Sequence, residues 1–348
     1  EFRRVLFRSL TQIVMQNGLG TYSEKYVITA RIYNNAGNQP KKAIEYYDKL
    51  DLNKEKVEPN DICQYALTYF DEPFHNYEKS LEIASIGNKR FPRYLPLNRT
   101  TLYNLVALGK FAEATEYVDR LFNKSDSTNY IINDFITSAN AYLGNKQYDE
   151  ALDMFKKAQD FKGVSAANRL AAIKGMSDVH EAKNDYLQAI ATYKDYLAGL
   201  RSENLPVKVD ALDKLGKMHR NYAADLTGEE QAKRLQEAAA VYADIIKQFP
   251  ANADYAHFMK AGIMANLDPE LKTGLAFEDY KRVVEIVEAA DNKDETDKSR
   301  LNKAYSYLFN YYYILKNDKE NARIYLQKLI DFNPNNQDLK NMMDELNK

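Results

Sequence analysis

The chain has 348 residues, with 48 Lys and Arg against 50 Asp and Glu, and its net charge of −2 excludes the global basic excess that binds nucleic acid. With only 13 Gly and 9 Pro, it lacks the many turns that sheets and barrels need, so we predict a mostly helical protein. Its single cysteine, Cys63, excludes an internal disulfide and a cysteine-rich zinc or iron–sulfur site.

Residues 1–9 differ from the rest of the chain because they hold three Arg in a sequence that otherwise prefers Lys. One reverse translation of this segment resembles the end of a common sequencing adapter read in frame. We therefore expect residues 1–9 to be non-native and residues 10–21 to be the remnant of a truncated N-terminal region. A short basic amphipathic segment is the alternative. If the true N-terminus is missing, a signal peptide, a lipid anchor and further repeats before Leu10 all stay open.

A short pattern recurs along the remaining sequence: a small residue, a large apolar residue four positions later, and another apolar residue three positions after that. Ala114, Ala151 and Ala189 begin its best copies. Apolar residues at this spacing form one stripe of an amphipathic helix, and a small residue within the stripe lets a neighbouring helix approach closely. The small residues stand at 43, 80, 114, 151, 189, 238, 276 and 322.

A second amphipathic stretch precedes each copy, so each unit is predicted to be a pair of antiparallel helices. We place the units at about 22–52, 60–92, 96–125, 130–162, 167–200, 208–250, 254–290 and 299–334. Extra residues at 223–231 and a charged stretch at 291–299 are expected as insertions, and the first should tolerate bulky substitutions because loop residues bury little. Residues 335–348 are predicted to form a capping helix with a more polar outer face.

The units resemble the tetratricopeptide repeat (TPR) family, whose helix-turn-helix unit has 34 residues. The residues that carry the resemblance in the fourth unit are Phe135, Ala139, Tyr142, Tyr148, Ala151, Phe155 and Ala158. Residues 331–336 match the turn between repeats, whereas the chain has no Trp and has Asn310 where the family has a small residue. The resemblance covers roughly residues 22–334. It implies an all-α fold, a right-handed α-solenoid of about eight TPR-like repeats with a C-terminal capping helix.

The resemblance also implies that the first helix of each repeat lines a concave groove that binds a peptide or protein partner. The groove residues expected here are Arg31, Asn35, Arg99, Tyr103, Asn140, Lys174, Asp178, Lys217, Arg220, Tyr307 and Tyr311. Some members of the family hold the terminal carboxylate of a peptide with Lys, Asn and Arg on adjacent first helices. In this chain Asp178 follows Lys174, and Asp213 precedes Lys217, so an acid beside each cation disfavours a carboxylate ligand at these pairs.

Residues that could carry catalysis or bind metal do not form a known motif. The four histidines, His75, His180, His219 and His257, fall in four different units, and Cys63 has no histidine nearby in the sequence. No HExxH, phosphate-binding glycine loop or Gly-x-Ser-x-Gly is present. We predict that the histidines pack structurally, and that the protein is not an enzyme and uses no cofactor or metal.

The sequence therefore favours a non-enzymatic scaffold that binds a peptide or protein in a TPR groove, with no nucleic acid partner. The alternative is an exported envelope-assembly or carbohydrate-utilisation component, because the high Tyr, Asn and Lys usage is similar to that of Bacteroidota proteins. Neither the partner nor the oligomeric state follows from the sequence, and no apolar run approaches the roughly 20 residues that span a bilayer. The compartment stays open, with a periplasmic or otherwise exported location slightly preferred to the cytoplasm.

Overall fold

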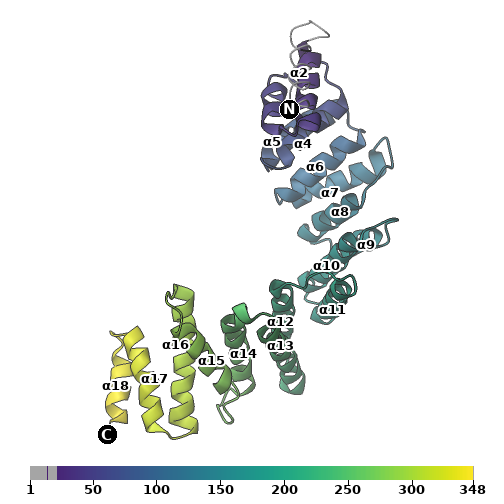
Figure 1. The fold of residues 1–348 in the computed structure, drawn as a ribbon. Coiled ribbons are helices and arrows are strands. Elements are labelled where there is room, and N and C mark those ends of the chain that lie inside the picture. Colours follow the sequence, from purple (N-terminus) through teal and green to yellow (C-terminus); the bar gives the residue numbers. More distant parts are fainter. Residues whose placement is uncertain (1–13, 15–21, 348) are drawn as a thin grey trace. The chain divides into compact units, whose positions relative to one another are not determined.

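The computed structural model describes residue 14 and residues 22–347, so residues 1–9 and the 10–21 segment apart from Val14 lie outside the described residues. Within the described part, every regular element is helical, which confirms the predicted all-α class (Figure 1). The chain divides into two compact units, one up to Val179 and one from His180 on, and each is described by itself.

The first unit contains nine α-helices in its described part. They are α2 (Tyr22–Arg31), α3 (Pro40–Tyr47), α4 (Pro59–Phe70), α5 (Tyr77–Arg90), α6 (Leu95–Ala107), α7 (Phe111–Asp119), α8 (Ile132–Gly144), α9 (Tyr148–Gln159) and most of α10 (Ala166–Ala182). Two π-helical segments, η1 (Ile32–Ala36) and η2 (Arg120–Lys124), extend α2 and α7. Successive helices pack against each other, and three buried apolar clusters follow one another along this unit.

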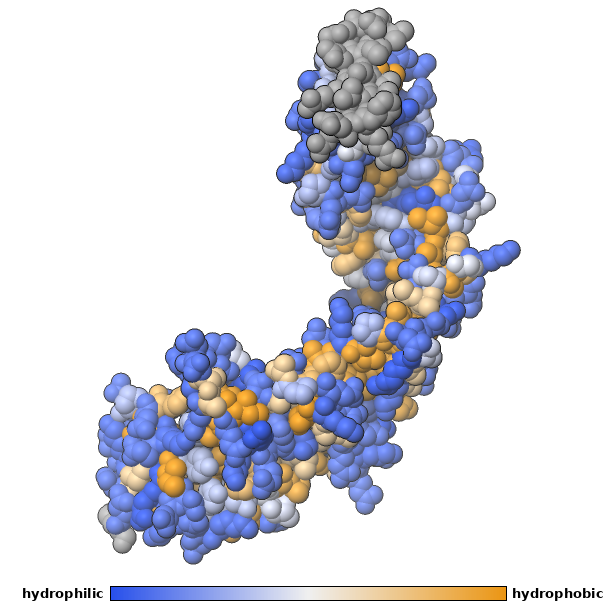
Figure 2. Space-filling view, in the orientation of Figure 1, coloured by the Kyte–Doolittle hydropathy of each residue, from blue (hydrophilic) through white to orange (hydrophobic). Residues whose placement is uncertain are grey.

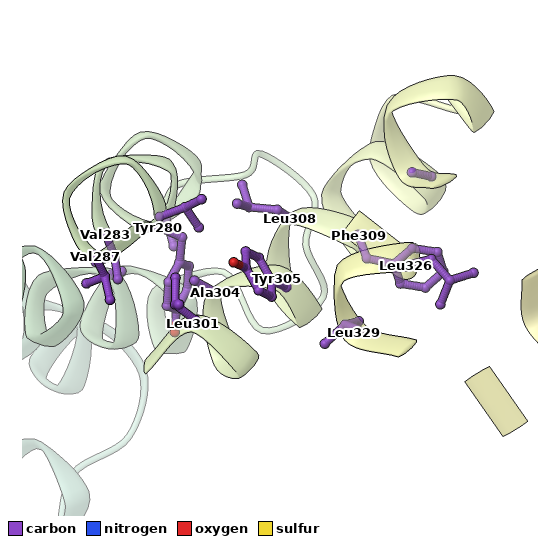
Figure 3. Packing of buried hydrophobic residues seen from close by; sticks show 14 of the residues in the cluster. Tyr280, Val283, Val287, Leu301, Ala304, Tyr305, Leu308, Phe309, Leu326 and Leu329 are labelled. Carbon is purple, nitrogen blue, oxygen red and sulfur yellow. The ribbon is translucent and has the colours of Figure 1, made fainter. Parts of the chain in front are cut away.

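The second unit continues the same succession of packed helices. Its helices are α11 (Tyr186–Ser202), α12 (Val209–Ala224), α13 (Gly228–Gln248), α14 (Ala253–Leu267), α15 (Phe277–Glu288), α16 (Glu295–Asn310), α17 (Lys319–Phe332) and α18 (Gln337–Leu346). The short segments are η3 (Pro250–Asn252), a 3₁₀-helix between α13 and α14, and η4 (Tyr311–Leu315), a π-helix after α16. Figure 3 shows Tyr280, Val283 and Val287 of α15 packed near side chains of α16, with Leu326 and Leu329 of α17 beyond them.

The small residues of the repeated pattern are buried in the helix packing, since all eight are 0% exposed. In most units, a residue with positive φ stands five positions earlier, in the turn that leads into the second helix. These turn residues are Asn38, His75, Gly109, Lys146, Asn184, Leu271 and Asn317, with φ between 45° and 70°. A tight left-handed turn followed by a small buried residue therefore brings each second helix back along the first.

Ala114→Leu is expected to destabilise the protein by about 1–3 kcal/mol, because the added atoms must displace close-packed neighbours between α6, α7 and α8. Ala112 is exposed on the same helix, so Ala112→Leu supplies a matched control that should change stability by less than about 0.5 kcal/mol. Thermal unfolding followed by circular dichroism measures both variants. Equal melting temperatures for the two would show that the helix contact has been placed wrongly.

The extra residues at 223–231 are helical instead of forming the expected loop. The helix α12 continues to Ala224 and α13 begins at Gly228, so residues 225–227 alone connect them. Glu229 and Glu230 occupy the first turn of α13, where carboxylates favour a helix N-terminus. Ala223 is 2% exposed and Leu235 is 6% exposed. Within 223–231 Ala223 is the one buried residue and most others are exposed, so the loop assignment is wrong, whereas tolerance of bulky substitutions away from Ala223 stays a prediction.

The C-terminal helix α18 caps the array, as predicted. Leu346 is 4% exposed, and Leu339 and Met342 pack partly buried against the core formed by α15, α16 and α17. The Arg323 guanidinium on α17 donates to the Leu346 carbonyl oxygen at 2.7 Å. Polar side chains cover the outer face of α18, which ends the stack with a surface that water can solvate.

Candidate functional site

The first predicted groove residues lie at the C-terminal end of α2 and in η1. Arg31, the last residue of α2, forms an ion pair with Asp61 in the first turn of α4, and the Asp61 side chain is 6% exposed. Asn34 donates to Thr68 Oγ1 of the same helix at 3.1 Å, whereas Asn35 is exposed in η1. Arg31 therefore connects two successive first helices.

Arg99 and Tyr103 of α6 both bind the buried carboxylate of Asp134 on α8. Arg99 donates from Nε to Asp134 Oδ1 at 2.7 Å and from Nη2 to Oδ2 at 2.8 Å, and the Tyr103 hydroxyl donates to Oδ1 at 2.9 Å. Asp134 also accepts the Ile131 backbone N–H at 2.9 Å and is 0% exposed. Burial and this carboxylate raise the pKa of Tyr103. The structure thus brings two predicted groove residues together, but as a clamp between α6 and α8.

Three further predicted residues of the first unit lie on α8 and α10. Asn140 is exposed on α8. Lys174 and Asp178 lie one turn apart on α10, with Nζ and Oδ2 3.1 Å apart and the two side chains 43% and 29% exposed. The lysine charge is therefore already compensated by its own helix.

Lys217 is similarly paired within the second unit. Its Nζ lies 2.7 Å from Asp213 Oδ2, and its side chain is 46% exposed. Asp213 also accepts the hydroxyls of Tyr242 and Tyr255 at 2.9 and 2.8 Å, so it joins α12, α13 and α14. The hydrogen bond to Asp213 raises the pKa of Lys217. Lys217 remains accessible, but a ligand anion would compete with Asp213 for it.

Arg220, one turn further along α12, lines a cavity of about 470 Å³. The cavity lies at the C-terminal ends of α12 and α14 and beside the start of α13. Its lining residues are Arg220, Asn221, Ala223, Ala224, Gln231, Leu235, Asn266 and Pro269. Second helices usually begin three residues before the small residue, as α9 does at Tyr148 before Ala151, but α13 begins ten residues before Ala238. The wall formed by Gln231 and Leu235 therefore exists because the insertion is helical.

Tyr307 and Tyr311 pack against the loop that joins α14 to α15. The Tyr307 hydroxyl accepts the Ala276 backbone N–H at 3.2 Å, and the Tyr311 ring stacks on Phe277 with centroids 4.1 Å apart. Gly274 has φ of 75°, and a Cβ there would lie 2.4 Å from the Tyr311 ring, so the close approach requires glycine. These two tyrosines mainly support the loop, although Tyr311 keeps partial exposure.

Asp268 holds the same loop in place. Its carboxylate accepts backbone N–H groups of Lys272, Thr273 and Gly274 at 2.7, 3.0 and 2.7 Å, and also the Thr273 hydroxyl at 2.9 Å. Burial alone would raise the pKa of Asp268, but these hydrogen bonds outweigh it and lower the pKa to about 2. The loop beside the Arg220 cavity is therefore well fixed at neutral pH.

His219 and Cys63 are buried, whereas the His75 side chain is 54% exposed, so the prediction of structural packing does not hold for His75. His219 is 0% exposed, and its Nδ1 lies 3.0 Å from Glu237 Oε2. Cys63 is buried with Sγ 3.4 Å from Thr100 Oγ1, and burial raises the pKa of its thiol. Among residues 22–347, no three His, Cys, Asp or Glu side chains are grouped to hold a metal ion. In the same part of the chain, no helix has the length and apolar character needed to cross a membrane.

Asp213 was recognised from the sequence as the acid beside Lys217, whereas the acceptors Asp61 and Asp134 were missed. A usable signal was present for these two, since Asn-Asp pairs at 60–61 and 133–134 stand near the start of the first helices α4 and α8. Each of these carboxylates forms an ion pair with an Arg on the preceding first helix. No comparable signal in the sequence predicted the Arg220 cavity, because one wall of the cavity depends on the length of α13.

Comparisons with known proteins bear on the fold alone. No protein-family model matches the sequence, and no curated protein matches it. The structure is similar to the C-terminal part of a TPR repeat-containing protein from Cytophaga hutchinsonii, with a TM-score of 0.63 and 18% identity over 80% of this chain and 98% of that one. It is also similar to MamA from Desulfovibrio magneticus, with a TM-score of 0.44 and 14% identity over 53% of this chain and 98% of that one. The first similarity, together with the consecutive helix pairs and the cap, shows that the chain has a TPR-like α-solenoid fold.

Proposed function

We propose that the chain is a non-enzymatic interaction scaffold, and that a peptide or protein segment binds along the face of α12 that carries Lys217 and Arg220. A TPR-like array buries its apolar stripes between neighbouring helices and leaves the first-helix side chains as an extended surface. In the described residues this surface holds no assembled catalytic group. Binding is the chemistry that such a surface can perform.

The observation that carries the proposal is the difference between Arg220 and the other predicted cations. Arg31 and Arg99 are ion-paired to buried or nearly buried carboxylates, and Lys174 is paired on its own helix. Arg220 makes no ion pair with any described residue and lines an open cavity. A scaffold needs such a group, since Arg contributes strongly to protein interfaces when a partner desolvates it.

The surface of the second unit supports a mixed polar and apolar contact. In Figure 2 mostly hydrophilic residues cover the visible face, and hydrophobic residues appear among them in separate areas. The described residues include three exposed apolar side chains near the α14–α15 loop and η4, namely Leu275, Tyr313 and Ile314, which are 42%, 42% and 63% exposed. Interfaces combine apolar contact with a few oriented polar groups in this way.

The proposal is tested with a peptide selected from a random display library against the full chain. Replacing Lys217 and Arg220 together by alanine should weaken its binding by about tenfold or more. Lys281 and Arg282 are exposed on α15, so the same double replacement there is the matched control and should leave affinity unchanged. Failure of the library to give any specific binder would contradict the proposed function.

A further inference from the structure

A cavity of about 490 Å³ lies in the first unit, between α5 and the connection from α3 to α4. Its wall combines buried apolar side chains, such as Leu52 and Ile83, with the exposed residue Asp48. Among the described lining residues, Tyr65 alone belongs to a first helix, so the cavity is not part of the first-helix surface. Arg90 of α5 donates to the Leu52 carbonyl oxygen at 2.7 Å and so ties the connection to α5.

The Asp48 carboxylate is held by two hydroxyl groups. Its Oδ1 accepts the Tyr65 and Tyr69 hydroxyls at 2.6 and 2.9 Å, and its Oδ2 lies 3.0 Å from the Tyr69 hydroxyl. Burial and the hydrogen bonds to Asp48 raise the pKa of both tyrosines, so their hydroxyls stay protonated and donate at neutral pH. The carboxylate is therefore fixed in place, and Oδ2 is the less occupied of its two oxygens.

The lysines around the cavity leave the charge of Asp48 uncompensated. Lys79 pairs with Glu82 on its own helix at 2.9 Å, and Lys49 lies over the Tyr46 ring, 5.0 Å from its centroid. Asp48 accepts tyrosine hydroxyls and makes no ion pair with any described residue. It directly follows the last residue of α3, where the helix dipole adds partial negative charge. A cation bound at Oδ2 would therefore be attracted by the carboxylate and by the helix end.

We infer that this cavity binds a primary ammonium group carried on an apolar stem. An ammonium is a compact charge with three N–H donors, and one donor can bind Oδ2 of Asp48 while the stem contacts Leu52 and Ile83. A guanidinium is less suited, because its paired hydrogen bonds need both carboxylate oxygens, and Oδ1 already accepts two hydroxyls. A divalent metal ion needs several oxygen ligands, and no three His, Cys, Asp or Glu side chains are grouped to hold one in the part of the chain that the structure describes. The ammonium can come from a free alkylamine or from a lysine side chain, since both offer the same group.

Three probes test the site and distinguish these sources: pentylamine, 1-pentanol and Nα-acetyl-lysine amide. Each is titrated at neutral pH, where both amines are protonated, into the isotopically labelled full chain. The NMR signals of the Leu52 and Ile83 methyl groups are followed. We expect saturable shifts with at least one ammonium probe, and binding of 1-pentanol that is weaker by about tenfold or more. The ammonium probe that binds more tightly identifies the source.

Asp48→Asn should abolish the preference for the ammonium over the alcohol, because the amide keeps an oxygen for the tyrosine hydroxyls but carries no charge. Asp51→Asn is the matched control, since Asp51 lines the same cavity but pairs with Lys54 at 3.0 Å. It should change the preference by less than about threefold. Circular dichroism checks that both variants keep their helicity, and the comparison of pentylamine with 1-pentanol on the parent chain needs no variant.

Equal binding of pentylamine and 1-pentanol, or no shift with either ammonium probe, would overturn the inference. An unchanged preference in Asp48→Asn, or an equal loss in Asp51→Asn, would also overturn it, because the cation would then not be bound by Asp48. The proposed function would still stand in each case, since its binding surface lies on α12 of the second unit.

Discussion

Asp134→Ala is expected to lower the free energy of unfolding of the first unit by about 3–5 kcal/mol, since it breaks a buried ion pair from one side. The replacement removes the acceptor for Arg99 and Tyr103 together with the bond from the Ile131 backbone N–H. Arg99, only 19% exposed, would keep its charge with no carboxylate opposite it. The clamp between α6 and α8 would then open, and the segment from 125 to 131 would lose its anchor.

Hydrogen exchange under increasing denaturant measures this loss because it resolves the helices of a repeat array individually. Amides of α6 and α8 should exchange faster in Asp134→Ala, and those of α15 and α16 should not change. Asp153→Ala is the matched control, since Asp153 is 58% exposed and pairs with Lys157 on its own helix. It should cost no more than about 0.5 kcal/mol. A similar effect of the two replacements would mean that the clamp does not stabilise the repeat contact.

Acidification from pH 6.5 to 4.5 is expected to remove about 2–3 kcal/mol of stability from the second unit through His219. Burial, followed by the nearby charges of Lys194 and Arg234, lowers the pKa of this histidine from 6.5 to about 4, although Glu237 opposes the shift. Below pH 6.5, His219 therefore binds a proton in the unfolded chain but stays neutral in the folded chain. Stability falls as the pH drops through this window and stops changing, for this group, below about pH 4.

His219→Leu isolates the contribution of the histidine because it removes the titrating ring while keeping a buried apolar volume. Urea unfolding at several pH values should give a shallower decline in stability between pH 6.5 and 4.5 for this variant than for the parent chain. The pKa of Glu237 is lowered by Arg234 and His219 despite its partial burial, so most of its own contribution to stability is lost below pH 4.5. Parallel pH profiles for the two proteins would contradict the buried position of His219.

Much of the fold could be predicted because it depends on local pattern. Ala114, Ala151 and the other small residues were identified from spacing, and each is fully buried. The cap was predicted from one apolar stripe on an otherwise polar helix, and Leu346 is buried as expected. These features require only that apolar residues recur at helical spacing.

The candidate binding surface was harder to predict because it depends on which side chains meet across 30 or more residues. Arg31 and Arg99 were assigned to the groove from their positions, and the structure pairs them with Asp61 and Asp134 of the next first helix. The segment at 223–231 was expected to be a loop because it interrupts the repeat length. Instead, α13 begins inside this segment, with Glu229 and Glu230 in its first turn and Leu235 buried further along. The start of α13 builds one wall of the Arg220 cavity.

We propose that this chain binds a partner through the exposed first-helix surface of α12. The most direct test compares the dissociation constant of a library-selected peptide for the parent chain with that for the chain carrying Lys217→Ala and Arg220→Ala. The two proteins are first shown to have the same helicity and melting temperature, as expected for side chains that are partly exposed. We predict a dissociation constant at least about tenfold larger for the double variant. Equal dissociation constants would show that the partner does not bind along α12.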